Sequence, residues 1–178
     1  ALGADDPMWR GALSGPGSLY VHSDRPMISE NATSTFIHEL VHVAMRARSG
    51  PQADWIVEGL AEYYSLETLH RSGTVSTARF EQAHRTLADW AAREAGPLDA
   101  PRSAGATTAR AVGVLRTLDA EIRAASGGRK SLDDVVADLA AQPEAVTLEM
   151  FRAGAERHAG RTLSSLQPAV LKEPPVER

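Results

Sequence analysis

The residues best suited to chemistry are two histidines in the run His38-Glu39-Leu40-Val41-His42. Residues four apart on a helix project from the same face about one turn apart, so both imidazoles can bind one metal ion. Glu39, between them, can take a proton from a water molecule that such an ion activates. This H-E-x-x-H spacing predicts a hydrolytic zinc site with His38 and His42 as ligands and Glu39 as the general base and acid.

A catalytic zinc ion takes three protein ligands and keeps a fourth position open, so a third ligand is needed. Glu58 lies far enough beyond His42 for one helix to end, turn and be followed by a second that returns antiparallel. Gly59, directly after it, allows two helices to approach closely. We therefore expect Glu58 to complete the ligand set. We expect Glu62, one turn further on, to accept a hydrogen bond from a ligating histidine.

Simpler interpretations apply to the other polar and aromatic residues. A glutamate on an amphipathic helix is usually a solvated surface residue, and for Glu62 that alternative stays open. Four histidines have no partner at ligand spacing and are expected to be surface or capped residues: His22, His70, His84 and His158. Four aromatic residues are expected in the core rather than at a substrate: Trp55, Tyr63, Tyr64 and Trp90.

Hydrophobic periodicity and helix stop signals predict the elements that position these residues. Residues 1–17 are rich in Gly and Pro and are expected to be loop, and 18–22 alternates like a strand, which gives one or two strands in this region. Helices are predicted at about 31–48, 54–72, 76–95 and 107–125, with shorter ones opening at Ser131 and Thr147. Asp134, three residues after Ser131, indicates an acidic capping box. The expected fold class is α+β and mostly helical, with a short N-terminal β element and a helical C-terminal half.

Length and composition predict one compact domain. A chain of 178 residues with 43% hydrophobic and 24% charged residues can bury a core of its own. We expect a single domain over 1–167, with a loop and β edge at 1–28, the zinc-binding helix pair at 31–72 and a helical part at 76–167. The tail, 168–178, is expected to fray. Because the chain begins without Met, we interpret it as a processed product or an excised domain.

Charge and cysteine content restrict the partners and cofactors. A formal charge of −4 without a basic patch argues against nucleic acid, and no apolar run is long enough to span a membrane. The absence of cysteine excludes a disulfide framework, a Cys-based zinc ribbon and a thiol nucleophile. Any zinc ion must therefore be bound by histidine and carboxylate.

Together with H-E-x-x-H, the run Trp55-Ile56-Val57-Glu58-Gly59-Leu60-Ala61-Glu62-Tyr63-Tyr64 resembles the gluzincin metallopeptidases. In these, a downstream Glu in an E-G-x-x-x-Y setting is the third zinc ligand. The chain is more narrowly similar to the catalytic domain of the glycyl aminopeptidase family, often fused in bacteria to a PDZ domain. Segments 110–123 and 127–135 resemble that family's long helix and its following G-x-x-S-L-D-D run. The resemblance implies a thermolysin-like zincin fold, a zinc-dependent peptidase, a peptide or protein substrate and a periplasmic or secreted location.

Two positions depart from the family pattern. The tyrosine taken to stabilise the oxyanion is replaced by Thr108, so we expect another donor to serve, such as Tyr20, His84 or Arg110. Segment 11–15 has no acid to bind a substrate's amino group, so the resemblance does not extend to aminopeptidase specificity. The leading hypothesis is a zinc peptidase. The alternatives are a catalytically impaired gluzincin-like domain that binds zinc or peptides without efficient turnover, and a helical structural domain with a chance motif.

Overall fold

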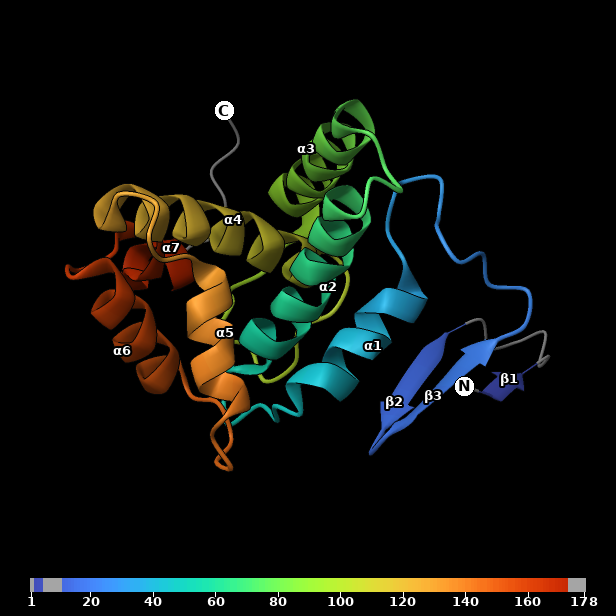
Figure 1. The fold of residues 1–178 in the computed structure, drawn as a ribbon, viewed down its shortest axis with the longest axis horizontal. Helices are drawn as coiled ribbons and strands as arrows, with labels where there is room; N and C mark the ends of the chain where they lie inside the picture. Colours follow the sequence, from blue (N-terminus) through green and yellow to red (C-terminus); the bar gives the residue numbers. More distant parts are fainter. Residues whose placement is uncertain (1, 5–10, 173–178) are drawn as a thin grey trace. The chain divides into compact units, whose positions relative to one another are not determined.

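The computed structural model of the chain describes residues 2–4 and 11–172, which are mostly helical with a small N-terminal sheet (Figure 1). The α+β, mostly helical class is therefore confirmed, whereas the thermolysin-like fold stays a prediction. The described strands are β1 (Leu2–Ala4), β2 (Ala12–Gly15) and β3 (Ser18–His22). The described helices are α1 (Thr35–Met45), α2 (Asp54–Arg71), α3 (Thr77–Glu94), α4 (Ala106–Ser126), α5 (Leu132–Ala140), α6 (Leu148–Ala159), the 3₁₀ helix η1 (Ser164–Leu166) and α7 (Pro168–Lys172). Within this part of the chain, no helix combines the length and apolarity needed to cross a membrane.

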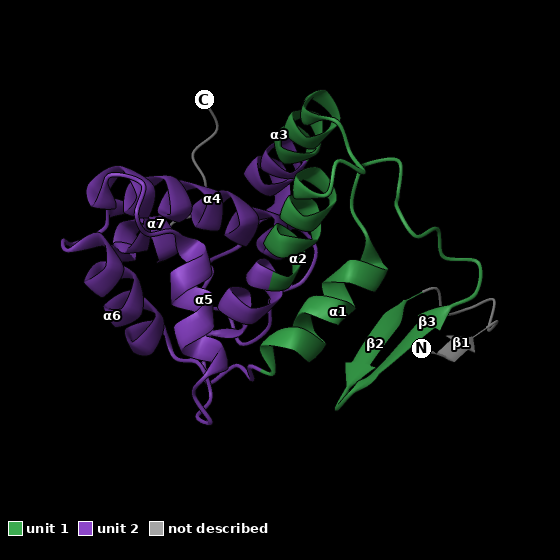
Figure 2. Cartoon of the chain, viewed as in Figure 1, with its two compact units in different colours: residues 1–46, 61–86 green, residues 47–60, 87–178 purple. Residues whose placement is uncertain are grey.

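The chain forms two compact units (Figure 2). Unit 1 comprises residues 1–46 and 61–86, and unit 2 comprises 47–60 and 87–178. Helix α2 contributes its first turns to unit 2 and the remainder to unit 1. The single domain over 1–167 stays a prediction.

The sheet of unit 1 has the strand order β1-β3-β2. β3 follows the predicted strand at 18–22, and β2 pairs with it antiparallel, with Leu13 opposite Tyr20. β1 pairs with β3 in parallel. The expectation of loop for 1–17 was thus wrong for 2–4 and 12–15. Pairing with β3 supplies backbone hydrogen bonds that a local reading of the Gly-rich sequence does not include.

Helix α1 is shorter than the predicted 31–48 because local signals end it at both sides. The side chain of Ser34 accepts a hydrogen bond from the Ile37 N–H and caps the N-terminus. At the other end, Arg46 adopts a left-handed conformation, with φ of 53°, and its N–H bonds to the His42 carbonyl. The helix therefore spans about three turns and carries the complete H-E-x-x-H motif.

Unit 2 is a helical assembly in which α4 contacts α5, α6 and η1. Its core contains fully buried side chains, among them Leu115, Leu118, Ile122, Leu132 and Phe151. Trp55, from the first turn of α2, is buried and meets Phe151 edge to face, with ring centroids 6.1 Å apart. The first turns of α2, which include Glu58, are therefore anchored in the core of unit 2.

Residues 168–172, the described part of the tail that was expected to fray, are helical. Residues 168–172 form α7, in which Leu171 is buried and its carbonyl accepts a hydrogen bond from the Leu98 N–H at 2.9 Å. Proline suits the first position of a helix because its fixed φ is helical and the N–H it lacks would have no helical partner. Residues 173–178 lie outside the described part of the chain.

Gly59 is required where α2 meets α4. A Cβ added there would lie 2.7 Å from the Ala111 Cβ and 3.1 Å from Leu115 Cδ1. We expect Gly59→Ala to lower the free energy of unfolding by about 1–3 kcal/mol, as overpacking does. In the control Gly113→Ala, on the exposed face of α4, the new methyl meets nothing within 4 Å. In this control, the higher helix propensity of alanine should raise the free energy of unfolding by about 0.5–1 kcal/mol. Urea denaturation measures both free energies. Equal stabilities of the Gly59→Ala and Gly113→Ala variants would contradict the close approach of α2 to α4 at Gly59.

The capping box of α5, predicted from Ser131 and Asp134, is present. A hydrogen bond from the Lys130 ammonium and another from the Ser131 N–H hold the pKa of Asp134 below its ordinary value of 3.8. A lowered carboxyl pKa adds stability that is complete above the unfolded-state pKa and is lost as the pH falls through the folded-state pKa. We therefore expect the stability difference between wild type and Asp134→Asn to be full at pH 7 and to shrink below about pH 4. Urea unfolding at several pH values measures this difference. The exposed Asp89→Asn is the control, and a pH-independent Asp134→Asn difference would contradict the assignment.

Candidate metal centre

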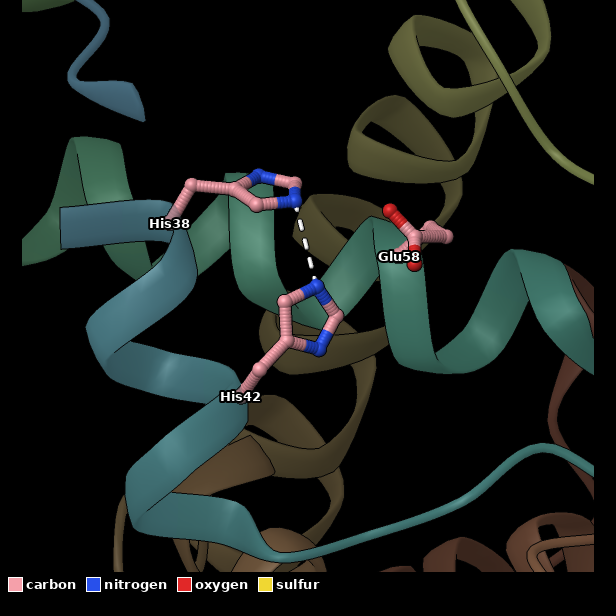
Figure 3. Close-up of side chains that lie close together, drawn as sticks. All are labelled: His38, His42 and Glu58. Atoms are coloured by element: carbon pink, nitrogen blue, oxygen red, sulfur yellow. Dashed lines mark hydrogen bonds between the residues drawn. The ribbon is translucent and has the colours of Figure 1, made fainter. Parts of the chain in front are cut away.

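The three predicted ligands lie together. His38 and His42 project from α1 and Glu58 from α2, and one ligand atom from each lies within 4.8 Å of the others (Figure 3). All three side chains are half-buried. Among residues 2–4 and 11–172, this is the one such group of histidine and carboxylate side chains. It could hold a metal ion.

The histidine pair has the spacing of a tetrahedral metal site. Nε2 of His38 and Nε2 of His42 lie 3.2 Å apart, and their rings meet edge to face. Two nitrogens bound to one zinc ion at 2.0–2.1 Å with tetrahedral angles would be about 3.3 Å apart. The same two atoms are within hydrogen-bond distance, with one ring as the donor. Two imidazoles and a carboxylate are also a donor set found in catalytic zinc sites, so the residues fit this ion.

Glu62 orients one of these rings. Its Oε2 lies 3.0 Å from Nδ1 of His38, and the two side chains are only 17% and 15% exposed. An ionised carboxylate can only accept, so this contact selects the tautomer with hydrogen on Nδ1. Nε2 of His38, the atom that faces His42, then carries the lone pair available to a metal. The contact expected for Glu62 is present.

The positions of these side chains follow from the register of two antiparallel helices. At the start of α1, the Ser34 N–H donates to Ser65 Oγ, which donates in turn to the Ser34 carbonyl. One turn along α1 and one turn back along α2, His38 meets Glu62. A further turn on each helix brings His42 level with Glu58. The sequence interpretation missed Ser34 and Ser65, although a serine directly before a helix is a recognisable cap signal.

The helix turn before Glu58 is fixed by Asp54. One carboxylate oxygen of Asp54 accepts from Ser49 Oγ at 2.9 Å, and the other accepts from the Ser103 N–H at 2.8 Å. Ser103 Oγ in turn lies 3.0 Å from Thr108 Oγ1. All four residues belong to unit 2. This chain of hydrogen bonds ties the first turn of α2 to the first turn of α4.

Most of the residues considered as oxyanion donors are buried or hydrogen-bonded to other residues. The Thr108 hydroxyl bonds to Ser103. The buried Arg110 donates to the Gly96 and Val170 carbonyls at 2.7 and 2.6 Å, and its burial lowers the pKa of the guanidinium. His84 is buried and forms a T-shaped pair with the Phe80 ring. Of the three alternatives to Thr108, only Tyr20 is exposed, by 40%.

Two of the histidines expected at the surface or in caps are buried. His84 is buried, and its ring meets that of Phe80 edge to face, with ring centroids 4.5 Å apart. His22 is also buried, with its Nδ1 accepting from the Asp24 N–H. The other two bond to side chains, His70 to Thr77 and His158 to Asp138. Of the aromatic residues expected in the core, Trp55 and Tyr63 are buried, and Tyr64 and Trp90 only partly so.

Removing the Glu62 carboxylate should weaken metal binding without removing a ligand. We expect Glu62→Ala to raise the zinc Kd by about 10- to 100-fold, because the His38 ring loses the partner that fixes its tautomer. The matched control is Glu67→Ala, on the same helix, whose carboxylate pairs with Arg71. Competition titration against a zinc chelator measures both. A Glu62→Ala protein with the Kd of Glu67→Ala would contradict this role.

No protein-family model, curated protein or solved structure gives a significant match to this chain, so the gluzincin resemblance rests on the residues described above.

Proposed function

We propose that this chain is a zinc-dependent peptidase domain in which His38, His42 and Glu58 hold the ion. The observation that carries the proposal is the convergence of these three donors, with the two Nε2 atoms 3.2 Å apart. The Glu62 contact adds to it, because a histidine that binds a metal usually donates its other ring N–H to a carboxylate, as His38 does to Glu62. The chemistry of the donor set favours zinc over harder ions such as Mg²⁺ or Ca²⁺, which prefer oxygen ligands.

Glu39 is the proposed general base and acid. A bound zinc ion supplies a Lewis acid that polarises the substrate carbonyl and lowers the pKa of water. The half-buried Glu39 carboxylate takes a proton from the attacking water while the water oxygen forms a bond to the substrate's carbonyl carbon. It then delivers this proton to the amine nitrogen as the C–N bond breaks. The products are a carboxylic acid and an amine, and Glu39 ends in its starting state.

A second candidate is a domain that binds zinc or peptides without efficient turnover. The observation that favours it is the engagement of Thr108 and Arg110 within unit 2. Neither offers an uncommitted hydroxyl or guanidinium to an oxyanion. Loss of one such donor typically lowers kcat by about 10²–10³. The two candidates share the metal site and differ in rate.

The Glu39→Gln variant separates metal binding from chemistry. We expect it to retain zinc and to lose hydrolysis by about 10²–10⁴-fold, because the amide cannot accept the proton. His38→Ala and Glu58→Ala are expected to lose both zinc and hydrolysis. The control Glu30→Gln makes the same change at an exposed position before α1. Metal content and cleavage of a peptide library with free and blocked N-termini measure these effects.

Each outcome of this experiment bears on one assignment. An active Glu39→Gln protein would contradict the role of Glu39, and stoichiometric zinc in both His38→Ala and Glu58→Ala would contradict the ligand set. A wild-type protein that binds zinc and peptides but cleaves no library member would favour the second candidate. The comparison of free and blocked N-termini distinguishes exopeptidase from endopeptidase activity.

A further inference from the structure

We infer that Ser65 is a positioning residue for the metal centre, because its hydroxyl sets the register of α1 against α2 that brings the histidines to Glu58 and Glu62. The inference rests on the proposed metal site but not on peptidase activity. It concerns a serine that is not itself a proposed ligand. Its two hydrogen bonds to Ser34 lie within unit 1.

The link between Ser65 and Ser34 is buried and reciprocal. Ser65 is 0% exposed and Ser34 is 1% exposed. The Ser34 N–H donates to Ser65 Oγ at 3.2 Å, and the same hydroxyl donates to the Ser34 carbonyl at 3.1 Å. Ser34 is also the cap of α1, since its own Oγ accepts from the Ile37 N–H. The hydroxyl of Ser65 is therefore fastened to the residue from which α1 begins.

The histidines of α1 and the acidic residues of α2 do not by themselves fix one register of the two helices. Histidines on α1 lie four residues apart, at positions 38 and 42, and acids on α2 also lie four apart, at 54, 58 and 62. A slip of one helical turn, about 5.4 Å, would set His38 against Glu58, or His42 against Glu62. Each slipped arrangement still pairs imidazole with carboxylate. The acid and histidine repeats alone thus permit several registers, of which only one gives the observed group.

Two features of the chain remove this ambiguity. Asp54 is engaged by Ser49 and Ser103 within unit 2, which withdraws it from competition for a histidine. In unit 1, a slip would separate Ser65 from Ser34 and leave a buried N–H without its partner, at a cost of about 1–3 kcal/mol. The serine pair penalises every register except the one that sets His38 against Glu62.

The test compares Ser65→Ala with a matched variant elsewhere. In Ser126, at the end of α4, the hydroxyl likewise accepts from one backbone N–H and donates to the carbonyl of the same residue, Lys130. Ser126→Ala therefore loses the same kind of bonds in a buried helical serine of unit 2. A second control, Ser34→Ala, removes the helix cap but keeps both main-chain groups that bond to Ser65.

Zinc affinity and the visible spectrum of the cobalt-substituted protein are the readouts, since both report the ligand geometry and neither requires turnover. We expect Ser65→Ala to raise the zinc Kd about tenfold, as loss of an orienting partner does, and to change the cobalt d–d bands. Ser126→Ala and Ser34→Ala should lower the midpoint of urea unfolding and keep the wild-type Kd and spectrum. Ser65→Thr, which retains the hydroxyl, should bind zinc more tightly than Ser65→Ala.

A Ser65→Ala protein with the wild-type zinc Kd and cobalt spectrum would overturn the inference and leave the proposed function standing. Should Ser65→Ala fail to fold, Ser65→Thr carries the test, and a tenfold weaker Kd in that variant would overturn the inference. A wild-type protein that binds neither zinc nor cobalt would overturn both the metal site and this role of Ser65. These outcomes therefore separate failure of the register role from failure of the site.

Discussion

The candidate metal centre depends on one constraint, the antiparallel register of α1 and α2. Each helix repeats its polar side chains at one-turn intervals. One fixed contact between a residue of α1 and a residue of α2 therefore sets which residues face each other in the following turns. The buried link between Ser34 and Ser65 provides that contact, and the hydrogen bond from His38 to Glu62 lies one turn further along. Once this pair is fixed, the helical repeat of α2 places Glu58 beside His42 without a further contact.

Helix α2 turns this register into a rigid arrangement of two carboxylates. Glu58 and Glu62 are separated by one turn, about 6 Å along the axis, and this spacing is set by backbone hydrogen bonds. The N-terminal end of the helix is fixed by Asp54 and by the close approach of Gly59 to Ala111. Because the helix is continuous, the packing that immobilises Glu58, the proposed ligand, also supports Glu62, which bonds to His38.

The sequence predicts those features whose physical cause is local. The i, i+4 spacing placed His38, His42 and Glu62 on helical faces, and the stop signals and the Ser131 cap located most helix ends. Features that depend on distant partners were not predicted. Strand β2 exists because β3 pairs with it, α7 is held by Leu98, and Ser65 looks like any helical serine until Ser34 lies beside it. Only the contact reveals its role.

Position 108 shows how a single side chain divides the two functional candidates. In the family that the sequence resembles, the matching position holds a tyrosine taken to stabilise the oxyanion. Here the Thr108 hydroxyl bonds to Ser103, whose N–H donates to Asp54 at the start of α2. The residue thus supports the scaffold that holds Glu58. The proposed metal binding, and the proposed proton transfer by Glu39, do not require an oxyanion donor at this position. Loss of such a donor costs about 3–4 kcal/mol of transition-state stabilisation. This cost is smaller than the transition-state stabilisation that a zinc site and a general base supply together. A slow peptidase is therefore compatible with every contact described for this site.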